Sequence, residues 1–156
     1  MKQNVIFLML TLASLNVFAK TPTGDKVDPL IEAKFKKEFG SAVTVSWKIV
    51  EGITIGTFTE QGEVKDVFYY EDGEILGRGK IIRRDMLPET VKTSINRRFS
   101  PGVIQTVYEF KEISYPTRYF VTVVTPRYSL IVAADEFGQM DVRQKIKSKP
   151  FYANVR

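Results

Sequence analysis

VKDVFYYEDGEILGRGKII, residues 64–82, is the part of the sequence with the clearest structural pattern. It reads as a strand, a tight turn at Asp72-Gly73 and a second strand. Asp-Gly between apolar and aromatic residues is a strong hairpin signal, because a type I′ turn needs positive φ at both central residues. We therefore expect an antiparallel hairpin with a two-residue turn at Asp72-Gly73.

This turn fixes which side chains share a face of the hairpin. It pairs Tyr70 with Ile75 and Phe68 with Gly77, and alternation then sorts the remaining residues. The face that we expect a helix to cover carries Val64, Phe68, Tyr70, Ile75 and Ile81. The face that we expect to remain open carries Lys65, Val67, Tyr69, Leu76, Arg78 and Lys80. A register slip of one residue would exchange the two faces.

A weaker copy of the hairpin runs from Ser129 to Ile146, with Phe137-Gly138 at the corresponding turn. Arg78 and Lys80 match Arg143 and Lys145 at a separation of 65 residues, and Phe39 matches Phe99 at a separation of 60. A five-residue insertion near 113–116 accounts for the change of separation. The pattern predicts a tandem repeat with units at 28–84 and 85–146.

In the first repeat, Asp28-Pro29 is typical of a helix start, and Gly40 is well placed to end that helix. The apolar stripe consists of Ile31, Phe35 and Phe39. Residues 43–49 and 53–60 alternate as strands. We expect a three-residue loop with Gly52 in the left-handed position, which would place Trp47 beside Ile55, and a further turn at Gln61-Gly62.

The second repeat follows the same order. Its helix stripe consists of Leu87, Val91, Ile95 and Phe99, and Ser100-Pro101-Gly102 ends the helix. Strands are expected at 103–112, 118–125, 128–135 and 139–146. Two helices and eight strands predict an α+β domain over 28–146, in which each repeat has one helix and four antiparallel strands. The helices are expected to cover one face of the sheet and to leave the other face open.

The N-terminus has the layout of a secretory signal peptide at residues 1–19. Lys2 precedes a short apolar run from Val5 to Leu15, and Val17-Phe18-Ala19 suits the cleavage site. A buried N-terminal strand is the alternative. Cleavage would leave a mature chain without a transmembrane segment, and this predicts a periplasmic or secreted protein. Residues 20–27 are expected to be a flexible tail, and residues 147–156 a basic C-terminal tail.

Composition limits the chemistry. The net charge of +5 falls to +4 if Lys2 is removed, which favours anionic partners slightly but does not indicate nucleic acid. The chain has no histidine and no cysteine, so a neutral-pH general base, a thiol nucleophile and most zinc sites are absent. We therefore expect no cofactor, no metal and no catalysis. Two carboxylate pairs, Glu71-Asp72 and Asp135-Glu136, leave a hydrolase as a remote alternative, but acidic residues at turns usually serve the turn.

Several short motifs resemble the PepSY-like, β-lactamase-inhibitor-like (BLIP-like) proteins, a group of small secreted bacterial proteins. The residues that carry the resemblance are Phe35-x-x-x-Phe39, Val45-x-Trp47, Phe58, Asp72-Gly73 and Leu87-Pro88. The resemblance covers about Phe35 to Ile146 and implies tandem helix-plus-four-strand repeats with a sheet face available for binding. The named inhibitor has disulfides, whereas this chain has none, and no inhibitory loop matches. Only the architecture is carried over.

The leading hypothesis is a non-catalytic binding module, with an inhibitor-like role as one form of it, that holds a protein or peptide partner on the open sheet face. The cations of that face favour an acidic partner. The candidate residues of this face are Phe58, Lys65, Val67, Tyr69, Leu76, Arg78, Lys80, Arg143 and Lys145. Protection of sheet edges by Lys and Arg is the simpler explanation of the cations. A structural envelope protein that binds anionic cell-surface polymers is the second hypothesis.

Overall fold

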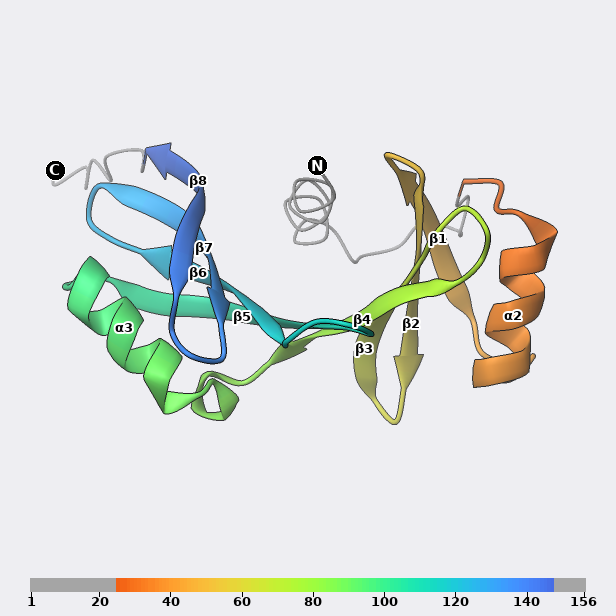
Figure 1. Cartoon of the computed structure of the whole chain (residues 1–156), viewed down its shortest axis with the longest axis horizontal. Helices are drawn as coiled ribbons and strands as arrows, with labels where there is room; N and C mark the ends of the chain where they lie inside the picture. The colour runs from red at the N-terminus through yellow and green to blue at the C-terminus, as the bar shows by residue number, and fades with distance from the viewer. Residues whose placement is uncertain (1–24, 148–156) are drawn as a thin grey trace, which may run out of the picture. The chain divides into compact units, whose positions relative to one another are not determined.

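The structure is a computed structural model that describes residues 25–147, and it is an α+β fold (Figure 1). The described residues contain two α-helices, one 3-10 helix and eight strands. The strands form an antiparallel open sheet in the order β1 to β8, so each strand lies beside the one that precedes it in the chain. The predicted signal peptide, N-terminal tail and C-terminal tail lie outside the described residues, except for 25–27 and Lys147.

The chain divides into two compact units. The first contains residues 25–80 and 110–115, and the second contains residues 81–109 and 116–147. Each unit contains one α-helix. No described helix has the length and apolar character that a membrane span requires.

The first helix, α2 (Pro29–Phe39), begins and ends where the sequence predicts. The Asp28 side chain accepts a hydrogen bond of 2.8 Å from the backbone N–H of Leu30, and this satisfies one free donor of the first turn. Gly40 follows the helix at φ +94°, a conformation that favours glycine. Ile31 and Phe35 form the buried stripe.

The strands β1 (Val45–Val50), β2 (Ile53–Glu60) and β3 (Glu63–Tyr69) are joined by two-residue turns. Both residues of Glu51-Gly52 and of Gln61-Gly62 have positive φ, as a type I′ turn requires. The predicted three-residue loop at Gly52 is therefore wrong. The shorter turn places Trp47 opposite Gly56 instead of Ile55. It also moves Phe58 to the face that Trp47 occupies, because a change of one residue exchanges the faces.

The hairpin of β3 and β4 (Ile75–Ile82) has a three-residue loop, Glu71-Asp72-Gly73, instead of the predicted two-residue turn. The N–H of Tyr70 donates to the carbonyl oxygen of Glu74, and the N–H of Gly73 donates to that of Tyr70, each at 2.9 Å. Tyr69 therefore pairs with Ile75, and the predicted pair of Tyr70 with Ile75 is wrong. A β-bulge at Leu76 compensates for the longer loop, so Phe68 still pairs with Gly77 as predicted.

The core of the first unit lies between α2 and the strand face that carries Phe58, Val67 and Tyr69. The Phe35 ring centroid lies 5.2 Å from that of Phe58 and 5.3 Å from that of Trp47. This is the face that the sequence analysis expected to be open. The face expected to be covered carries Val64 and Ile81, which are 54% and 67% exposed. The alternation was predicted correctly for β3 and for β4 beyond the bulge, but Ile75 lies on the face of Tyr69 and the helix was assigned to the wrong side.

The second unit begins with the end of β4 and the 3-10 helix η1 (Arg84–Met86), followed by α3 (Glu89–Phe99). Its strands are β5 (Val103–Glu112, of which residues 110–112 belong to the first unit), β6 (Arg118–Val124), β7 (Tyr128–Asp135) and β8 (Met140–Lys147). Val91 and Ile95 of α3 pack on a core that includes Val121 and Val132. All four strands lie within two residues of their predicted positions.

Candidate functional site

The structure removes four residues from the predicted binding face. Phe58, Val67 and Tyr69 lie in the core beneath α2 and are 4%, 0% and 0% exposed. Leu76, the extra residue of the bulge, is buried as well. Their prediction as part of an open face is wrong. The two-residue turn at Glu51-Gly52 moves Phe58 to the inner face, α2 covers Val67 and Tyr69, and Leu76 lies in the bulge.

The cations of the first hairpin lie together, as predicted, but on the helix-covered side. Arg78 pairs with Glu38 of α2 and lies 6.0 Å from the Phe39 ring centroid. The ammonium of Lys80 lies 3.0 Å from Glu63, and its hydrogen bond lowers the pKa of that carboxyl. The ammonium of Lys65 lies 2.6 Å from Glu60. Each cation thus has an anionic neighbour within the molecule.

The two candidate cations of β8 are also engaged. Arg143 is the extra residue of a second bulge and lies 3.8 Å from Asp141. The ammonium of Lys145 lies 3.8 Å from the centroid of the Tyr128 ring, within the range of a cation–π contact. The five predicted cations therefore do not form a cluster of unpaired positive charges.

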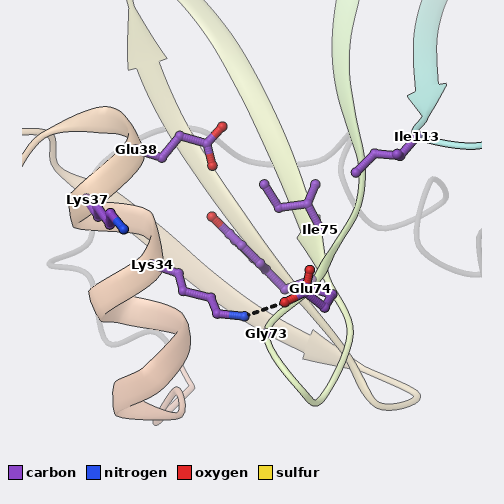
Figure 2. A pocket seen from close by; sticks show the side chains of 8 residues that line it. Lys34, Lys37, Glu38, Gly73, Glu74, Ile75 and Ile113 are labelled. Carbon is purple, nitrogen blue, oxygen red and sulfur yellow. Dashed lines mark hydrogen bonds and ion pairs between the residues drawn. The ribbon is translucent and has the colours of Figure 1, made fainter.

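An open pocket of about 460 Å³ lies beside α2, entirely within the first unit (Figure 2). We call it the α2 pocket. Figure 2 shows α2 on one side of it and the start of β4 and the end of β5 on the other. Its lining residues are Lys34, Lys37 and Glu38 from the helix, Tyr69, Gly73, Glu74 and Ile75 from the hairpin, and Ile113.

The hydroxyl of Tyr69 is the unusual group of this pocket. Among the described residues it is the one buried side-chain polar atom without a hydrogen-bond partner. Burial, and secondarily the negative charge of Glu38, raises the pKa of Tyr69 to about 12. The group therefore remains protonated near neutral pH and can donate a hydrogen bond. A buried polar group without a partner is costly, so this hydroxyl requires an explanation.

The carboxylates of the α2 pocket are already engaged. Glu74 accepts a hydrogen bond of 2.8 Å from the ammonium of Lys34, which is the dashed line of Figure 2. Glu38 pairs with Arg78 across the pocket edge. Lys37 has no ion pair among residues 25–147. The groups that lack partners are therefore Lys37 and Tyr69, and both are donors.

The second unit has the same loop but a different residue at this place. The N–H of Asp135 donates to the carbonyl oxygen of Gln139, and the N–H of Gly138 donates to the carbonyl oxygen of Asp135, each at 3.1 Å. These bonds repeat those of Tyr70, Gly73 and Glu74, so Ala134 corresponds to Tyr69. A loop of this kind therefore forms without a hydroxyl. The α2 pocket was not predicted from the sequence, although the contrast between Tyr69 and Ala134 at matching hairpins was a signal for it.

The turn carboxylates make the contacts expected of turns. Asp72 accepts from the N–H of Glu74 at 2.9 Å, and Asp135 accepts from the N–H groups of Phe137 and Gln139 at 3.0 and 2.9 Å. The described residues contain no group of three or more acidic side chains placed to hold a metal ion.

Comparison with known proteins finds solved structures with the same fold as this chain. No protein-family profile matches the chain, and no curated protein matches its sequence. A candidate periplasmic protein of Bacteroides eggerthii is similar in structure, with a TM-score of 0.67 at 17% identity over 78% of this chain and 89% of that one. A DUF2874 family protein of Bacteroides ovatus gives 0.65 at 17% identity over 85% and 96%. A BLIP-like protein of Bacteroides fragilis gives 0.60 at 18% identity over 79% and 89%. At these identities the similarity concerns the fold alone.

Proposed function

We propose that this chain is a non-catalytic binding protein, exported to the periplasm or secreted, that holds a protein or peptide partner at the α2 pocket. One observation carries the proposal: the pocket is lined by an unpaired donor, the Tyr69 hydroxyl, while its carboxylates are held in ion pairs. Concave sites with apolar walls and a few convergent polar groups are typical of ligand recognition.

The protonation chemistry of the pocket favours binding over catalysis. A general acid or base works best when its pKa lies near the working pH. The pKa of Tyr69, about 12, is far above neutral pH, so its hydroxyl is a poor general base there. The pocket also replaces the sheet face of the sequence analysis as the contact surface, because Phe58, Val67 and Tyr69 are buried.

Two further parts of the proposal rest on the resemblance and on the similar structures. The periplasmic assignment of the Bacteroides eggerthii protein and the signal-peptide layout of residues 1–19 together support export. The matching helix-and-four-strand order of the two halves, with the same loop bonds at Gly73 and Gly138, supports a tandem repeat of the PepSY-like, BLIP-like kind. An inhibitor-like role is one form that such binding would take.

A capture experiment with matched variants tests the binding function. Ile113 lines the α2 pocket and is 69% exposed, whereas Phe137 lies in the other hairpin loop and is 70% exposed. A glutamate at either position should leave the fold intact, because both side chains are mostly in water. Immobilised wild-type protein, I113E and F137E are each incubated with envelope extract, and captured proteins are identified by mass spectrometry.

We expect a partner that wild type and F137E retain and that I113E loses. Equal capture by all three proteins would place the contact elsewhere. If wild type captures nothing beyond what a heat-denatured sample captures, the binding function itself is wrong.

A further inference from the structure

The unsatisfied groups of the α2 pocket indicate what chemistry its occupant has. This step rests on the binding function proposed above and names the class of ligand. The hydroxyl of Tyr69 has no acceptor, and Lys37 has no anionic neighbour within ion-pair distance in the described part of the chain. A ligand that satisfies both must supply a hydrogen-bond acceptor with negative charge.

The neighbouring charged groups narrow this further. Lys34 forms an ion pair with Glu74, and Arg78 forms an ion pair with Glu38, so each carboxylate is already neutralised by a cation. A ligand cation would therefore have to compete with a lysine or an arginine that is already in place. An anion needs to displace no such partner to reach Lys37.

The other wall of the α2 pocket is apolar. Ile75 is half-buried and Ile113 is exposed, and Figure 2 shows both on the side opposite the helix. An exposed isoleucine beside a half-buried one offers apolar area that a ligand would remove from water. The pocket volume, about 460 Å³, suits a short aliphatic group together with a carboxylate.

We propose that the α2 pocket binds a carboxylate carried on an aliphatic body, which is the chemistry of a peptide C-terminus with an aliphatic last residue and of a free aliphatic acid. One carboxylate oxygen accepts from the Tyr69 hydroxyl, the charge lies near Lys37, and the aliphatic group packs on Ile75 and Ile113. The hydroxyl is closed to water in the free protein. The carboxylate therefore reaches it only when the side chains that cover the hydroxyl move aside.

The second unit supports a ligand role for the hydroxyl. Ala134 occupies the corresponding position next to the same type of loop, so the loop does not need the group. Neither a contact among the described residues nor the geometry of the loop explains the Tyr69 hydroxyl. The simplest explanation is that this hydroxyl binds a ligand.

Titration with defined carboxylates tests the proposal. Trp47 is the one tryptophan of the sequence, and its ring centroid lies 6.3 Å from that of Tyr69, so its fluorescence reports on the pocket. The probes are N-acetyl-alanyl-leucine and hexanoate, with N-acetyl-alanyl-leucinamide and hexanamide as uncharged matches. The proteins are wild type, Y69F, K37Q and the control K36Q, in which the changed lysine lies on α2 outside the pocket lining.

We expect at least one carboxylate to bind wild type and K36Q, and its amide to bind more weakly. Y69F should lose roughly 10- to 100-fold in affinity, the usual effect of one hydrogen bond to a charged group. K37Q should lose a smaller factor, because Lys37 is exposed. Binding of the peptide alone would assign the site to protein C-termini, and binding of hexanoate alone would assign it to small acids.

Equal binding of acids and amides, or unchanged affinity in Y69F, would overturn the carboxylate proposal. So would the absence of binding by both acids. If that absence were accompanied by capture of a partner that I113E loses, the binding function would stand and only the ligand class would be wrong.

Discussion

Replacing Tyr69 by phenylalanine should stabilise the protein. The substitution removes one oxygen and keeps the ring, which packs in the core with Phe35 and lies 6.3 Å from Trp47 between ring centroids. Most buried tyrosines lose stability in this exchange, because their hydroxyl has a partner. The Tyr69 hydroxyl has none among the described residues, so the exchange removes a desolvated group and leaves nothing unpaired.

The expected magnitude follows from the cost of an unsatisfied group. A buried donor without an acceptor costs about 1–3 kcal/mol, and relaxation around Lys34 and Glu38 should reduce this. We expect the free energy of unfolding to rise by about 1–2 kcal/mol in Y69F. For a domain of this size, the melting temperature should rise by roughly 3–8 °C.

The assay is urea and thermal unfolding followed by circular dichroism, with Y119F as the matched control. Tyr119 is also buried, but its hydroxyl has either a hydrogen-bond partner or access to water. We expect Y119F to be neutral or slightly destabilised. A loss of more than about 1 kcal/mol in Y69F would mean that the hydroxyl has a partner in the free protein. The carboxylate proposal would then lose its donor.

Alkaline pH provides a second measurement of the same group. The pKa of Tyr69 is about 12 in the folded protein and about 10 in an unfolded chain. Because the folded value is the higher one, the folded state favours the protonated phenol. The free energy of unfolding is therefore unaffected by this group below pH 10 and falls as pH rises from 10 toward 12. The other tyrosines are common to both proteins. The stability advantage of Y69F should therefore widen over that interval.

Four further predictions concern packing, charge and export. W47A should lose about 3 kcal/mol of stability, which is the low end for a tryptophan because Trp47 is half-buried. A loss below about 1 kcal/mol would mean that Trp47 does not belong to the core. G77A should be destabilised by about 1–3 kcal/mol, because a Cβ there would lie 2.6 Å from the carbonyl oxygen of Lys111; unchanged urea unfolding would contradict this close approach. The double variant R78A/K80A should lose less than about 1–2 kcal/mol, since each ion pair has one partner that is more than half exposed, and a thermal melt decides. N-terminal sequencing of exported protein should begin at Lys20, and an intact Met1 would exclude cleavage after residue 19.

The sequence contained the elements and most of their limits. Helix α2 follows from Asp28, the apolar stripe and Gly40, and strand β5 matches its predicted range at both ends. Local signals of this kind depend on neighbours in the chain, so they can be read without the fold. The α+β class and the eight antiparallel strands followed from them.

The sequence did not indicate which hairpin face lies under the helix. Both faces carry large apolar residues, since Phe68 is buried on one and Val67 on the other. The cations Arg78 and Lys80 were read as a mark of the open face. In the structure they lie on the covered face, where a carboxylate of α2 and one at the start of β3 reach them. Loop length added to the error, because Glu51-Gly52 suited either a two- or a three-residue connection.

Strand order equal to chain order has a consequence for how this protein acquires its structure. Every strand from β2 onward pairs with the strand that was made just before it. A chain that emerges from its N-terminus, at a ribosome or through a membrane pore, can therefore add strands one at a time, and none must wait for a distant partner. The spans between pairing residues are short at the hairpins, which favours rapid folding. The span from β4 to β5 is longer, because α3 lies between them in the chain, so the edge of β4 is exposed to other chains until β5 has been added.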